Sequence, residues 1–344
     1  MKENRPLVSV IVPCYNEEKF IPSLMGCILS QDYPAEKLEI FFIDGMSNDA
    51  TRELVEKYRS DKPDIHLLLN KQRFVPFALN LGIKNCHGEV IIRMDAHSQY
   101  PVNYISTLVR YLLELNADNV GGVWITKPAN CSLKALAIAG ALSSVFGVGN
   151  SYFRIGSSEI RKADTVPYGC FRRGIFDKIG LFDQELLRNQ DDEFNARILE
   201  NGGTIYLIPE VTITYHARPD LTSLIKMFYQ YGFFKPLVNI KLRQPATIRQ
   251  FIPPLFVLFL LFGWTGFLVA PAGGLVFLAG LCLYLLGDLF FTFKGMVDGR
   301  RFLLLFYMPW IFFLVHVAYG WGYLAGTIKF VILRKRQMVV SSSR

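Results

Sequence analysis

Polar side chains follow the first apolar run of the sequence in a combination that could bind a nucleoside. The run, Leu7–Val12, is rich in β-branched residues, as expected of a strand buried on both faces of a parallel sheet, and it leads into Pro13, Tyr15, Asn16 and Glu17. The tyrosine offers a flat aromatic face, and the amide and carboxylate offer polar atoms, which together suit a nucleobase and a ribose. A polar turn after a strand accounts for the shape of this segment but not for its residue types. The first glycine is Gly26, whereas a dinucleotide site has glycines directly after its first strand, so the pattern disfavours NAD.

Carboxylates and cations follow the next three expected strands. Asp44 closes the second strand, Lys71 and Arg73 follow the third, and Asp95 closes the fourth. A carboxylate at a strand end can bind Mg²⁺ or Mn²⁺, and cations there can meet phosphate groups. A purely structural interpretation also fits, in which Asp44 is a turn residue and Lys71 and Arg73 are a solvated pair of cations.

These residues depend on a regular alternation of strands and helices in the first part of the chain. The expected strands are 7–12, 38–43, 65–69 and 89–94, and the expected helices are 19–30, 50–58 (with Asp49 as its cap) and 75–84. This order predicts a doubly wound α/β sheet, in which ligands bind beyond the carboxyl ends of the strands. Farther along, the pattern predicts a strand at 121–124, a helix at 133–141, a polar loop at 147–158, a helix at 186–200 and a strand at 204–208.

The positive charge of the chain is concentrated in its last part. The 344 residues are 51% hydrophobic with a formal net charge of +8. Residues 1–214 carry −3, residues 215–250 carry +5 and residues 251–344 carry +6. The basic excess thus lies beside the most apolar stretches, which indicates a membrane face and not a nucleic-acid groove. We therefore expect a catalytic domain over 1–214, a basic amphipathic segment at the membrane surface over 215–250, and a membrane domain over 251–344.

Three uncharged runs predict membrane spans. The 38 residues between Arg249 and Asp288 carry no formal charge, and as helix they would measure about 57 Å, about twice the hydrocarbon core of a bilayer. The expected spans are 252–269, 275–293 and 302–328.

The side of the membrane on which the chain ends stays open. Basic clusters precede the first span and recur at Lys294, Arg300 and Arg301 and at 334–336, and the positive-inside rule would place all of them in the cytoplasm. Three full spans would leave the tail outside. Either the last run is a re-entrant or interfacial element, or the positive charges of the tail do not determine its side of the membrane.

Several motifs together resemble the family 2 glycosyltransferases. The resemblance begins in Val8–Glu18 and continues in Ile43–Thr51, Asn80–Gly82 and Arg93–His97. It implies a GT-A fold, a doubly wound mixed sheet of the nucleotide-diphospho-sugar transferase type. Within the family, the motif Asp-Ala-His and the apolar C-terminal runs resemble those of succinoglycan-biosynthesis glucosyltransferase-like membrane enzymes.

The resemblance implies roles on the donor side. Asp44 would contact the base or ribose, Asn80 would belong to the donor site, and Asp95 would hold the Mn²⁺ or Mg²⁺ that bridges the diphosphate. His97 stands where the family has a second aspartate, so it is either a metal ligand or a contact to phosphate or acceptor. His216 follows the last expected strand and would reach the metal or diphosphate, although a lone histidine is more often structural.

On the acceptor side the resemblance implies a general base at Asp191. The family usually has Glu-Asp here, but this chain has Gln190 followed by Asp191, with Asp192 and Glu193 next to it, so the register could differ by one. Acidic residues at a helix start can also simply complement the helix dipole. Tyr168 and Gly169 would floor the acceptor site, together with Gln190 and Asp192.

The function that these observations predict is that of a membrane-anchored, inverting, metal-dependent hexosyltransferase. The donor would be a nucleotide sugar such as UDP-glucose, and the acceptor a lipid-linked saccharide of the polyprenyl type in exopolysaccharide or cell-surface glycan synthesis. The expected location is the cell membrane, with several passes, contact with membrane lipids and the catalytic domain in the cytoplasm. The alternative is a non-catalytic component that binds nucleotide sugar in a polysaccharide assembly or transport system.

Overall fold

A nine-stranded mixed sheet organises the first of two units of the chain. The computed structural model describes residues 5–59, 63–299 and 302–335, and the predicted basic residues Arg300, Arg301 and Arg336 lie outside them. The first unit comprises the residues up to Ile125 and Gly156–Tyr215, and the second comprises Thr126–Ile155 and the residues from His216 onward. Residues 126–155, which the sequence analysis placed with the catalytic domain, thus belong to the unit of the C-terminal helices.

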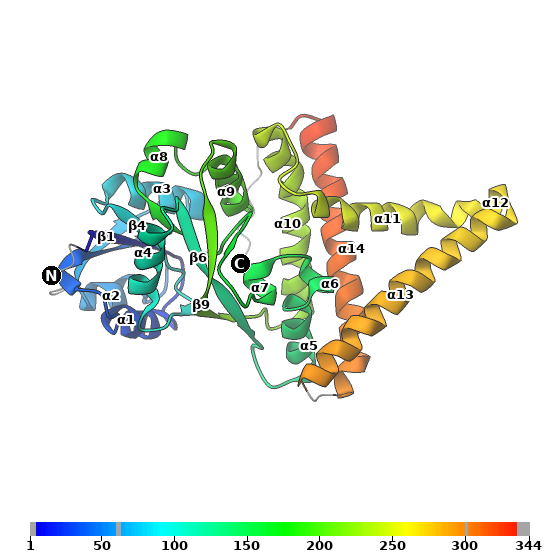
Figure 1. Cartoon of the computed structure of the whole chain (residues 1–344), viewed down its shortest axis with the longest axis horizontal. Coiled ribbons are helices and arrows are strands. Elements are labelled where there is room, and N and C mark those ends of the chain that lie inside the picture. The colour runs from blue at the N-terminus through cyan, green and yellow to red at the C-terminus, as the bar shows by residue number, and fades with distance from the viewer. Residues whose placement is uncertain (1–4, 60–62, 300–301, 336–344) are drawn as a thin grey trace. The chain divides into compact units, whose positions relative to one another are not determined.

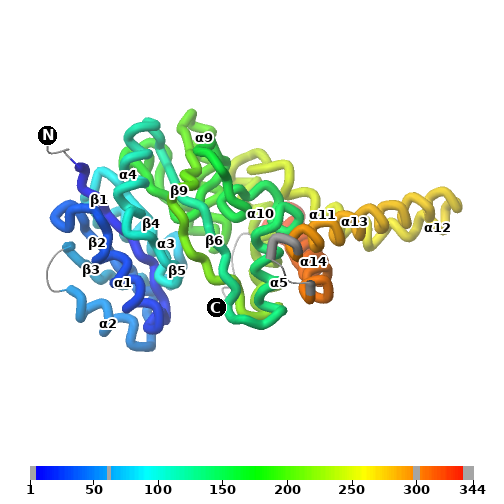
Figure 2. The backbone as a smooth tube through the Cα atoms, turned by 60° about the horizontal axis from the view of Figure 1, so that its bottom comes forward, coloured from blue at the N-terminus to red at the C-terminus, as the bar shows by residue number. Residues whose placement is uncertain are grey.

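The strand order of the sheet is β3-β2-β1-β4-β8-β6-β9-β5, with β7 paired to β9. The strands are β1 (Val8–Cys14), β2 (Leu38–Asp44), β3 (Asp64–Leu69), β4 (Val90–Arg93), β5 (Ser98–Gln99), β6 (Asn119–Lys127), β7 (Arg161–Lys162), β8 (Cys170–Arg172) and β9 (Ile205–His216). Strands β1 to β4 pair in parallel, whereas β8 joins β4 antiparallel. The expected mixed sheet is confirmed, and Figures 1 and 2 show it in two views.

Helices cover this sheet because its central strands are apolar on both faces. They are α1 (Ile21–Leu29), η1 (Ala35–Lys37), α2 (Thr51–Lys57), α3 (Val75–Asn85), α4 (Tyr104–Glu114), α8 (Gly174–Ile179) and α9 (Gln190–Glu200). Alternate residues of β1, Val8, Val10 and Val12, belong to one core cluster with residues of α1 and α4. On the other face, Ile11 lies so close to Gly82 of α3 that a Cβ there would come within 2.7 Å of it.

The second unit is helical. Its elements are α5 (Leu133–Leu142), α6 (Val145–Val148), α7 (Tyr152–Ile155), α10 (Leu221–Leu242), η2 (Ile248–Phe251), α11 (Ile252–Phe262), η3 (Gly263–Thr265), α12 (Gly266–Val269), α13 (Pro271–Gly299), η4 (Phe302–Phe306), α14 (Met308–Gly326) and the π-helical turn η5 (Thr327–Ile332). Three helical stretches, Ile248–Val269, Pro271–Met296 and Met308–Ile332, are long and apolar enough to cross a membrane.

Most element predictions hold, with differences outside the first four strands. Short helices α6 and α7 occupy the region predicted as a polar loop, α9 begins at Gln190 instead of 186, and β9 extends to His216 instead of ending at 208. Strand β8 is absent from the prediction because its three residues are too few to show a period.

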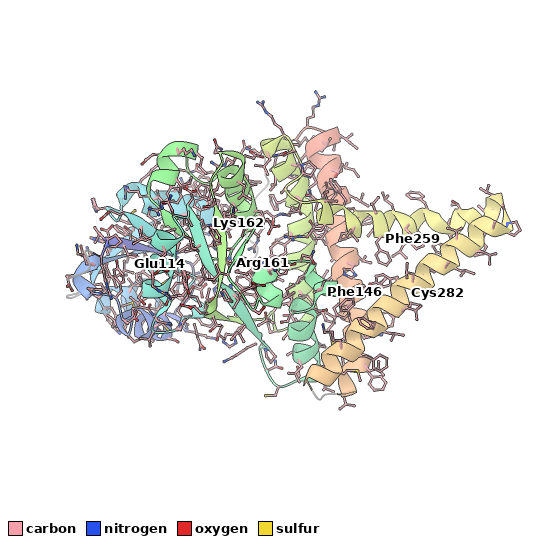
Figure 3. All side chains as sticks on the ribbon, viewed as in Figure 1. Glu114, Phe146, Arg161, Lys162, Phe259 and Cys282 are labelled. Carbon is pink, nitrogen blue, oxygen red and sulfur yellow. The ribbon has the colours of Figure 1, made fainter. Side chains whose placement is uncertain are left out.

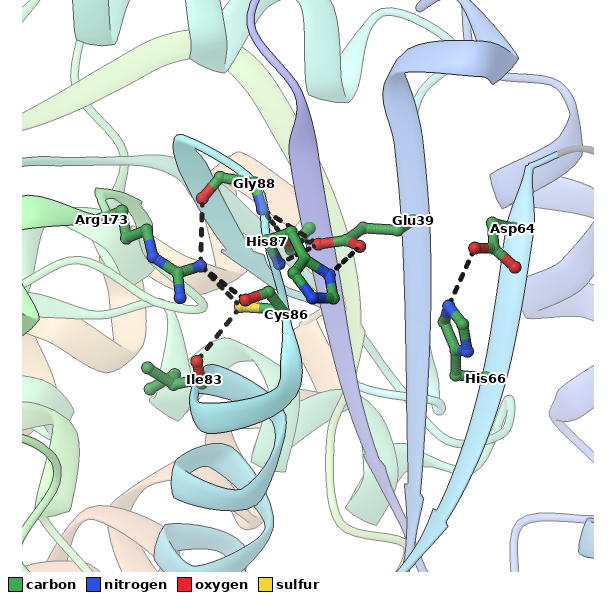
Figure 4. Close-up of polar contacts among 9 residues, drawn as sticks. Glu39, Asp64, His66, Ile83, Cys86, His87, Gly88 and Arg173 are labelled. Atoms are coloured by element: carbon green, nitrogen blue, oxygen red, sulfur yellow. Dashed lines mark hydrogen bonds and ion pairs between the residues drawn. The ribbon is translucent and has the colours of Figure 1, made fainter.

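A buried carboxylate, Glu39, ties the start of β2 to the segment before β4. It accepts hydrogen bonds from the Ser9 hydroxyl and from the backbone amides of His87 and Gly88. Figure 4 shows His87 and Gly88 beside the Glu39 carboxylate. Burial by itself would raise the pKa of Glu39, but these hydrogen bonds outweigh it and hold the pKa below its usual value. The ionised carboxylate is therefore favoured in the folded chain.

We expect Glu39→Gln to destabilise the first unit by about 1–3 kcal/mol, since an amide can accept only part of these bonds and its NH₂ group faces donors. Thermal unfolding of the purified full chain measures this, with Glu36→Gln, which changes an exposed residue nearby, as the control. Because the folded pKa is lowered, the stabilisation by Glu39 is present above the unfolded pKa and is lost as pH falls through the folded pKa. Equal melting temperatures for the two variants would contradict this role.

Candidate functional site

Four parallel strands end at one edge of the sheet and bring the predicted donor residues to it. Cys14 at the end of β1 pairs with Asp44 at the end of β2, which pairs with Leu69 at the end of β3. Arg93 at the end of β4 pairs with Ile11 of β1. The segments that follow these strands therefore share the edge where doubly wound sheets bind ligands.

The turn after β2 holds the loop after β1 in place. Asn16 is left-handed, with φ of 54°, and its backbone amide donates to the Ser47 hydroxyl at 2.8 Å. The backbone amide of Glu17 donates to the Thr51 hydroxyl at 2.8 Å. The carboxylate of Asp49 accepts from the hydroxyl and the amide of Thr51, so it orders this turn, although Ala50 occupies the cap position of α2. Two separate sequence motifs thus form one structural unit.

Asp44 is fully buried beneath this edge. One of its carboxylate oxygens accepts from the Ser47 amide at 3.0 Å and lies 3.8 Å from the Arg52 guanidinium. Its other oxygen, Oδ1, is buried and has no hydrogen-bond partner among the residues that the structure describes. A buried carboxylate oxygen without a partner is costly, which favours a hydrogen-bond donor from a ligand over a purely structural turn.

The residues around β1 and β3 differ in their exposure. Pro13 is buried within β1, whereas Tyr15 is half-buried. Lys71 and Arg73 are exposed, and Arg73 adopts a left-handed conformation that places its guanidinium 5.9 Å from the centre of the Tyr15 ring. The structure thus brings the predicted aromatic face together with one of the two predicted cations.

Arg93 joins the predicted base, Asp191, to the predicted metal ligand, Asp95. Its Nε and one terminal nitrogen donate to the two oxygens of Asp95 at 2.8 and 3.1 Å. Its other terminal nitrogen donates to both oxygens of Asp191 at 2.8 and 2.9 Å. The Arg93 side chain is only 10% exposed, so these contacts neutralise a nearly buried cation. Residues from β4 and α9, far apart in the sequence, therefore form a single charged centre.

Aromatic side chains support this centre from one side. The Tyr168 ring lies 5.6 Å from the Arg93 guanidinium, and its hydroxyl contacts the Ser98 hydroxyl at 2.9 Å. The Asp95 amide donates to the Tyr100 hydroxyl at 2.6 Å, and the Gly169 carbonyl accepts from the Arg93 amide. Tyr168 is 5% exposed, so it positions Arg93 rather than forming an open floor.

The three consecutive acidic residues of α9 have different partners. Asp191 binds Arg93, whereas Glu193 is buried and forms a bidentate ion pair with Arg197. Arg197 also donates to the Ile179 and Leu181 carbonyls, so Glu193 supports the fold. Asp192 is half-buried beside them. These contacts favour Asp191 as the base over the neighbouring register.

The pKa of Asp191 is raised above its ordinary value. Desolvation is the largest cause; Arg93 lowers the pKa, and the negative charges of Asp95 and Asp192 raise it again. The Asp191 side chain is still 39% exposed. It therefore combines access to a substrate with a raised affinity for a proton, which are two requirements of a general base.

A divalent metal fits this edge only if a ligand completes its coordination. Among the described residues there is no group of three His, Cys, Asp or Glu side chains that could hold a metal by themselves. Asp95 is a carboxylate just beyond a strand end, which is a ligand type that Mg²⁺ and Mn²⁺ accept, and it is paired with Arg93. His97 lies with its Nδ1 3.4 Å from the buried Glu17 carboxylate. One carboxylate together with substrate phosphates is a common way to bind Mg²⁺, and the residues present fit that mode.

Three predicted residues take other positions. The Asn80 side chain is buried and exchanges two hydrogen bonds with the backbone of Phe182, a structural role. Gln190 is buried at the first turn of α9. His216 is exposed at the last position of β9 and belongs to the second unit.

Two residues of the site, Arg93 and Tyr100, were not predicted from the sequence as site residues. Arg93 stands inside a recognised motif, but an arginine in a buried strand carries no sign of its partners, one of which is Asp191. Tyr100 binds both the amide and the carbonyl of Asp95. The one signal in the sequence was that Arg93 is a charged residue in an otherwise apolar strand, two residues before Asp95.

Comparisons with known proteins find similar sequences over most of the chain. Residues 9–180 match the family described as glycosyl transferase family 2. Dolichyl N-acetyl-alpha-D-glucosaminyl phosphate 3-beta-D-2,3-diacetamido-2,3-dideoxy-beta-D-glucuronosyltransferase of Methanococcus voltae is 26% identical over 330 residues, which are 94% of this chain and 97% of that protein. Succinoglycan biosynthesis protein ExoA of Rhizobium meliloti is 28% identical over 246 residues, 71% of this chain and 73% of its own.

A solved structure confirms the expected fold. The mannosyltransferase PcManGT from Pyrobaculum calidifontis, in complex with GDP-Man and Mn²⁺, has a TM-score of 0.59 and 19% sequence identity. The likeness covers 93% of this chain and 88% of that one.

The different partners of Asp191 and Glu193 predict different effects on stability. Glu193→Gln breaks a buried ion pair and should cost on the order of 3 kcal/mol of unfolding free energy. Asp191→Asn should cost much less, because Arg93 keeps Asp95 as a partner. Melting of the two purified variants side by side measures the difference. If Asp191→Asn were the more damaging change, the assignment of Glu193 to the fold and Asp191 to the site would be wrong.

Proposed function

Because the chain belongs to glycosyl transferase family 2, we propose that it transfers a hexose from a nucleotide sugar to a hydroxyl group of a lipid-linked saccharide, with inversion at the anomeric carbon. The observation that carries the proposal is the double ion pair of Arg93, which holds an exposed carboxylate of α9 beside a carboxylate at the donor edge. UDP-glucose is the first donor to test.

The donor edge supports binding of the nucleotide. Tyr15 offers its ring to the base, Asn16 and Glu17 lie on the loop that follows, and the unpartnered oxygen of Asp44 can accept a hydrogen bond from the base or ribose. Lys71 and Arg73 can meet the phosphates from the exposed loop after β3.

Asp191 is proposed as the general base. Its carboxylate removes the proton of the acceptor hydroxyl while the oxygen attacks the anomeric carbon from the face opposite the diphosphate, which leaves with the anomeric bonding pair. Arg93 keeps the Asp191 carboxylate oriented, and the raised pKa favours its taking up the proton. Asp192 and Gly169 stay candidates for contacts to the acceptor.

Asp95, with His97 as a further candidate ligand, would hold Mn²⁺ or Mg²⁺. A bound divalent cation supplies stabilisation of the negative charge on a departing diphosphate. The contact of His97 with Glu17 orients the imidazole at the donor edge.

The relatives and the apolar helices support the proposed acceptor class. The Methanococcus voltae relative is named for a dolichyl-phosphate-linked substrate, and three helical stretches of this chain could span a membrane. We propose a polyprenyl-type lipid acceptor in the cell membrane, with the first unit of the chain, called the catalytic unit from here on, in the cytoplasm. Anchoring raises the effective concentration of an acceptor that diffuses in two dimensions.

Asp191→Asn should lower the rate of sugar transfer by about 10²–10⁴-fold, because an amide cannot take up the proton. Membranes that contain the full chain are incubated with radiolabelled UDP- and GDP-hexoses, and label in the lipid extract is counted. Binding of the active donor should be unchanged. Wild-type transfer by Asp191→Asn would exclude it as the base.

Chelation by EDTA should abolish transfer, and Mn²⁺ or Mg²⁺ should restore it. Asp95→Asn should raise the metal concentration needed for half-maximal rate by an order of magnitude or more, because one anionic ligand is lost. Asp177→Asn, at an exposed position of α8, is the control. A variant at position 95 with the wild-type metal dependence would refute the ligand role.

A further inference from the structure

The three apolar helical stretches of the second unit are not equivalent. They differ in how much of their most apolar 18-residue segment is buried within the protein. That share is 11% for both Ile248–Val269 and Pro271–Met296, whereas it is 44% for Met308–Ile332. We propose that the chain crosses the membrane twice, through a hairpin of α11–α12 and α13, and that α14 lies with α10 on the membrane surface.

The two arms of the hairpin meet at the tip and diverge toward the base, as Figure 1 shows, and aromatic side chains still bridge them between these ends. At the tip, Gly266 and Gly273 bring the backbones so close that a Cβ on either would lie 2.7 Å from the other's carbonyl oxygen. The Phe259 ring lies 5.1 Å from the Phe277 ring farther along. Figures 1 and 3 show the arms, with Phe259 on α11 and Cys282 on α13. The arms therefore run antiparallel and form one element.

The hairpin has the length and surface that a bilayer requires. From Ile252 to Val269 are 18 residues, about 27 Å of helix, which is close to the hydrocarbon thickness. Leu268 and Leu283 are 75% and 73% exposed. The first charge on the returning arm is Asp288, one turn beyond Tyr284, which stacks on Phe256 near the base of the outgoing arm. The charged residue thus lies at the base of the hairpin, near the polar boundary of a membrane.

Helix α14 packs on α10 through glycines. A Cβ on Gly322 would lie 2.1 Å from the Tyr229 carbonyl oxygen, and one on Gly326 would lie 2.1 Å from the Phe233 carbonyl oxygen. The two backbones therefore touch, and the successive contacts show that the helices run in the same direction. They must lie at the same depth in any membrane.

The composition of α10 excludes a position inside the hydrocarbon. It carries Lys226, Lys235 and Lys241 along its 22 residues, and each lysine at the centre of a span would cost about 2.5–3.5 kcal/mol. Asn239 of α10 also donates to the Tyr323 hydroxyl of α14. Because α14 shares the depth of α10, it lies at the surface too.

Two crossings also place every basic cluster on one side. Arg249 precedes the hairpin, Lys294 follows Asp288 on the returning helix, and Arg334 and Lys335 follow α14. With two crossings these residues all lie on the side of the catalytic unit, as the positive-inside rule requires.

Cysteine labelling of the full chain in intact cells tests this disposition. In a background with Cys27, Cys131 and Cys282 replaced by serine, single reporters are placed at the hairpin tip (Ala272→Cys), in the tail (Ser342→Cys) and on the catalytic unit (Asp177→Cys). A membrane-impermeant maleimide is applied before and after permeabilisation. We expect the tail and the catalytic unit to react alike and the tip to behave oppositely. Any pattern in which the tail and the catalytic unit differ, or in which the tip matches them, overturns two crossings.

A matched pair of charge substitutions tests the depth of α14. Leu283→Lys places a charge on the exposed face of α13 and should abolish recovery of folded protein from membranes. Trp321→Lys, at a position of α14 that is 52% exposed, should retain wild-type recovery. Equal losses for the two variants would show that α14 is also surrounded by lipid and would refute the proposal. Neither result depends on the reaction that the chain catalyses.

Discussion

The guanidinium of Arg93 is the constraint on which the catalytic unit depends. A nearly buried arginine cannot give up its proton, so the fold has to bring anionic partners to it. It obtains them from two directions, Asp95 just beyond the end of its own strand and Asp191 at the start of α9. The ring of Tyr168 lies beside the guanidinium, and the carbonyl of Gly169 accepts a hydrogen bond from the backbone amide of Arg93. The position of α9 relative to the parallel strands is thereby linked to the charge balance of one side chain.

The same physical rule separates function from support within a short acidic run. Glu193 is buried and fully engaged by Arg197, which in turn holds the segment before α9. Asp191 keeps an exposed edge, and desolvation together with neighbouring negative charge raises its pKa. Residue type alone makes these carboxylates equivalent. Their partners and their exposure make one a structural ion pair and the other suited to proton transfer.

The parallel part of the sheet could be predicted from the sequence, because strands buried on both faces read as continuous apolar runs. The polar residues after those strands were predictable for the same reason, since parallel strands deliver their ends to one edge. Arg93 as the bridge was not, because its partner Asp191 comes from a helix far along the chain. Asn80 matches a family motif, yet its amide is used by the backbone of Phe182. The proposed surface position of α14 could not be predicted from hydropathy. It rests on close backbone contacts with α10, such as that of Gly322 with Tyr229, which only the structure shows.

The second unit shows why apolar length alone is a weak indicator of topology. A helix that contacts a lysine-bearing neighbour backbone to backbone is held at the depth of that neighbour, whatever its own composition. In this chain that leaves a two-armed hairpin as the element suited to hydrocarbon, beside two helices suited to the polar surface. The arrangement supports an acceptor that is drawn from the bilayer and not from solution.

The transfer rate of Arg93→Met tests the central claim most directly. If Arg93 holds the base and the donor-side carboxylate in one site, the variant should remain in the membrane, bind the nucleotide sugar and lose about 10²-fold or more of the turnover at saturating donor. Arg93→Lys should recover only part of that loss, because a single ammonium cannot bridge both carboxylates in the same geometry. Wild-type turnover by a folded Arg93→Met chain would contradict the account.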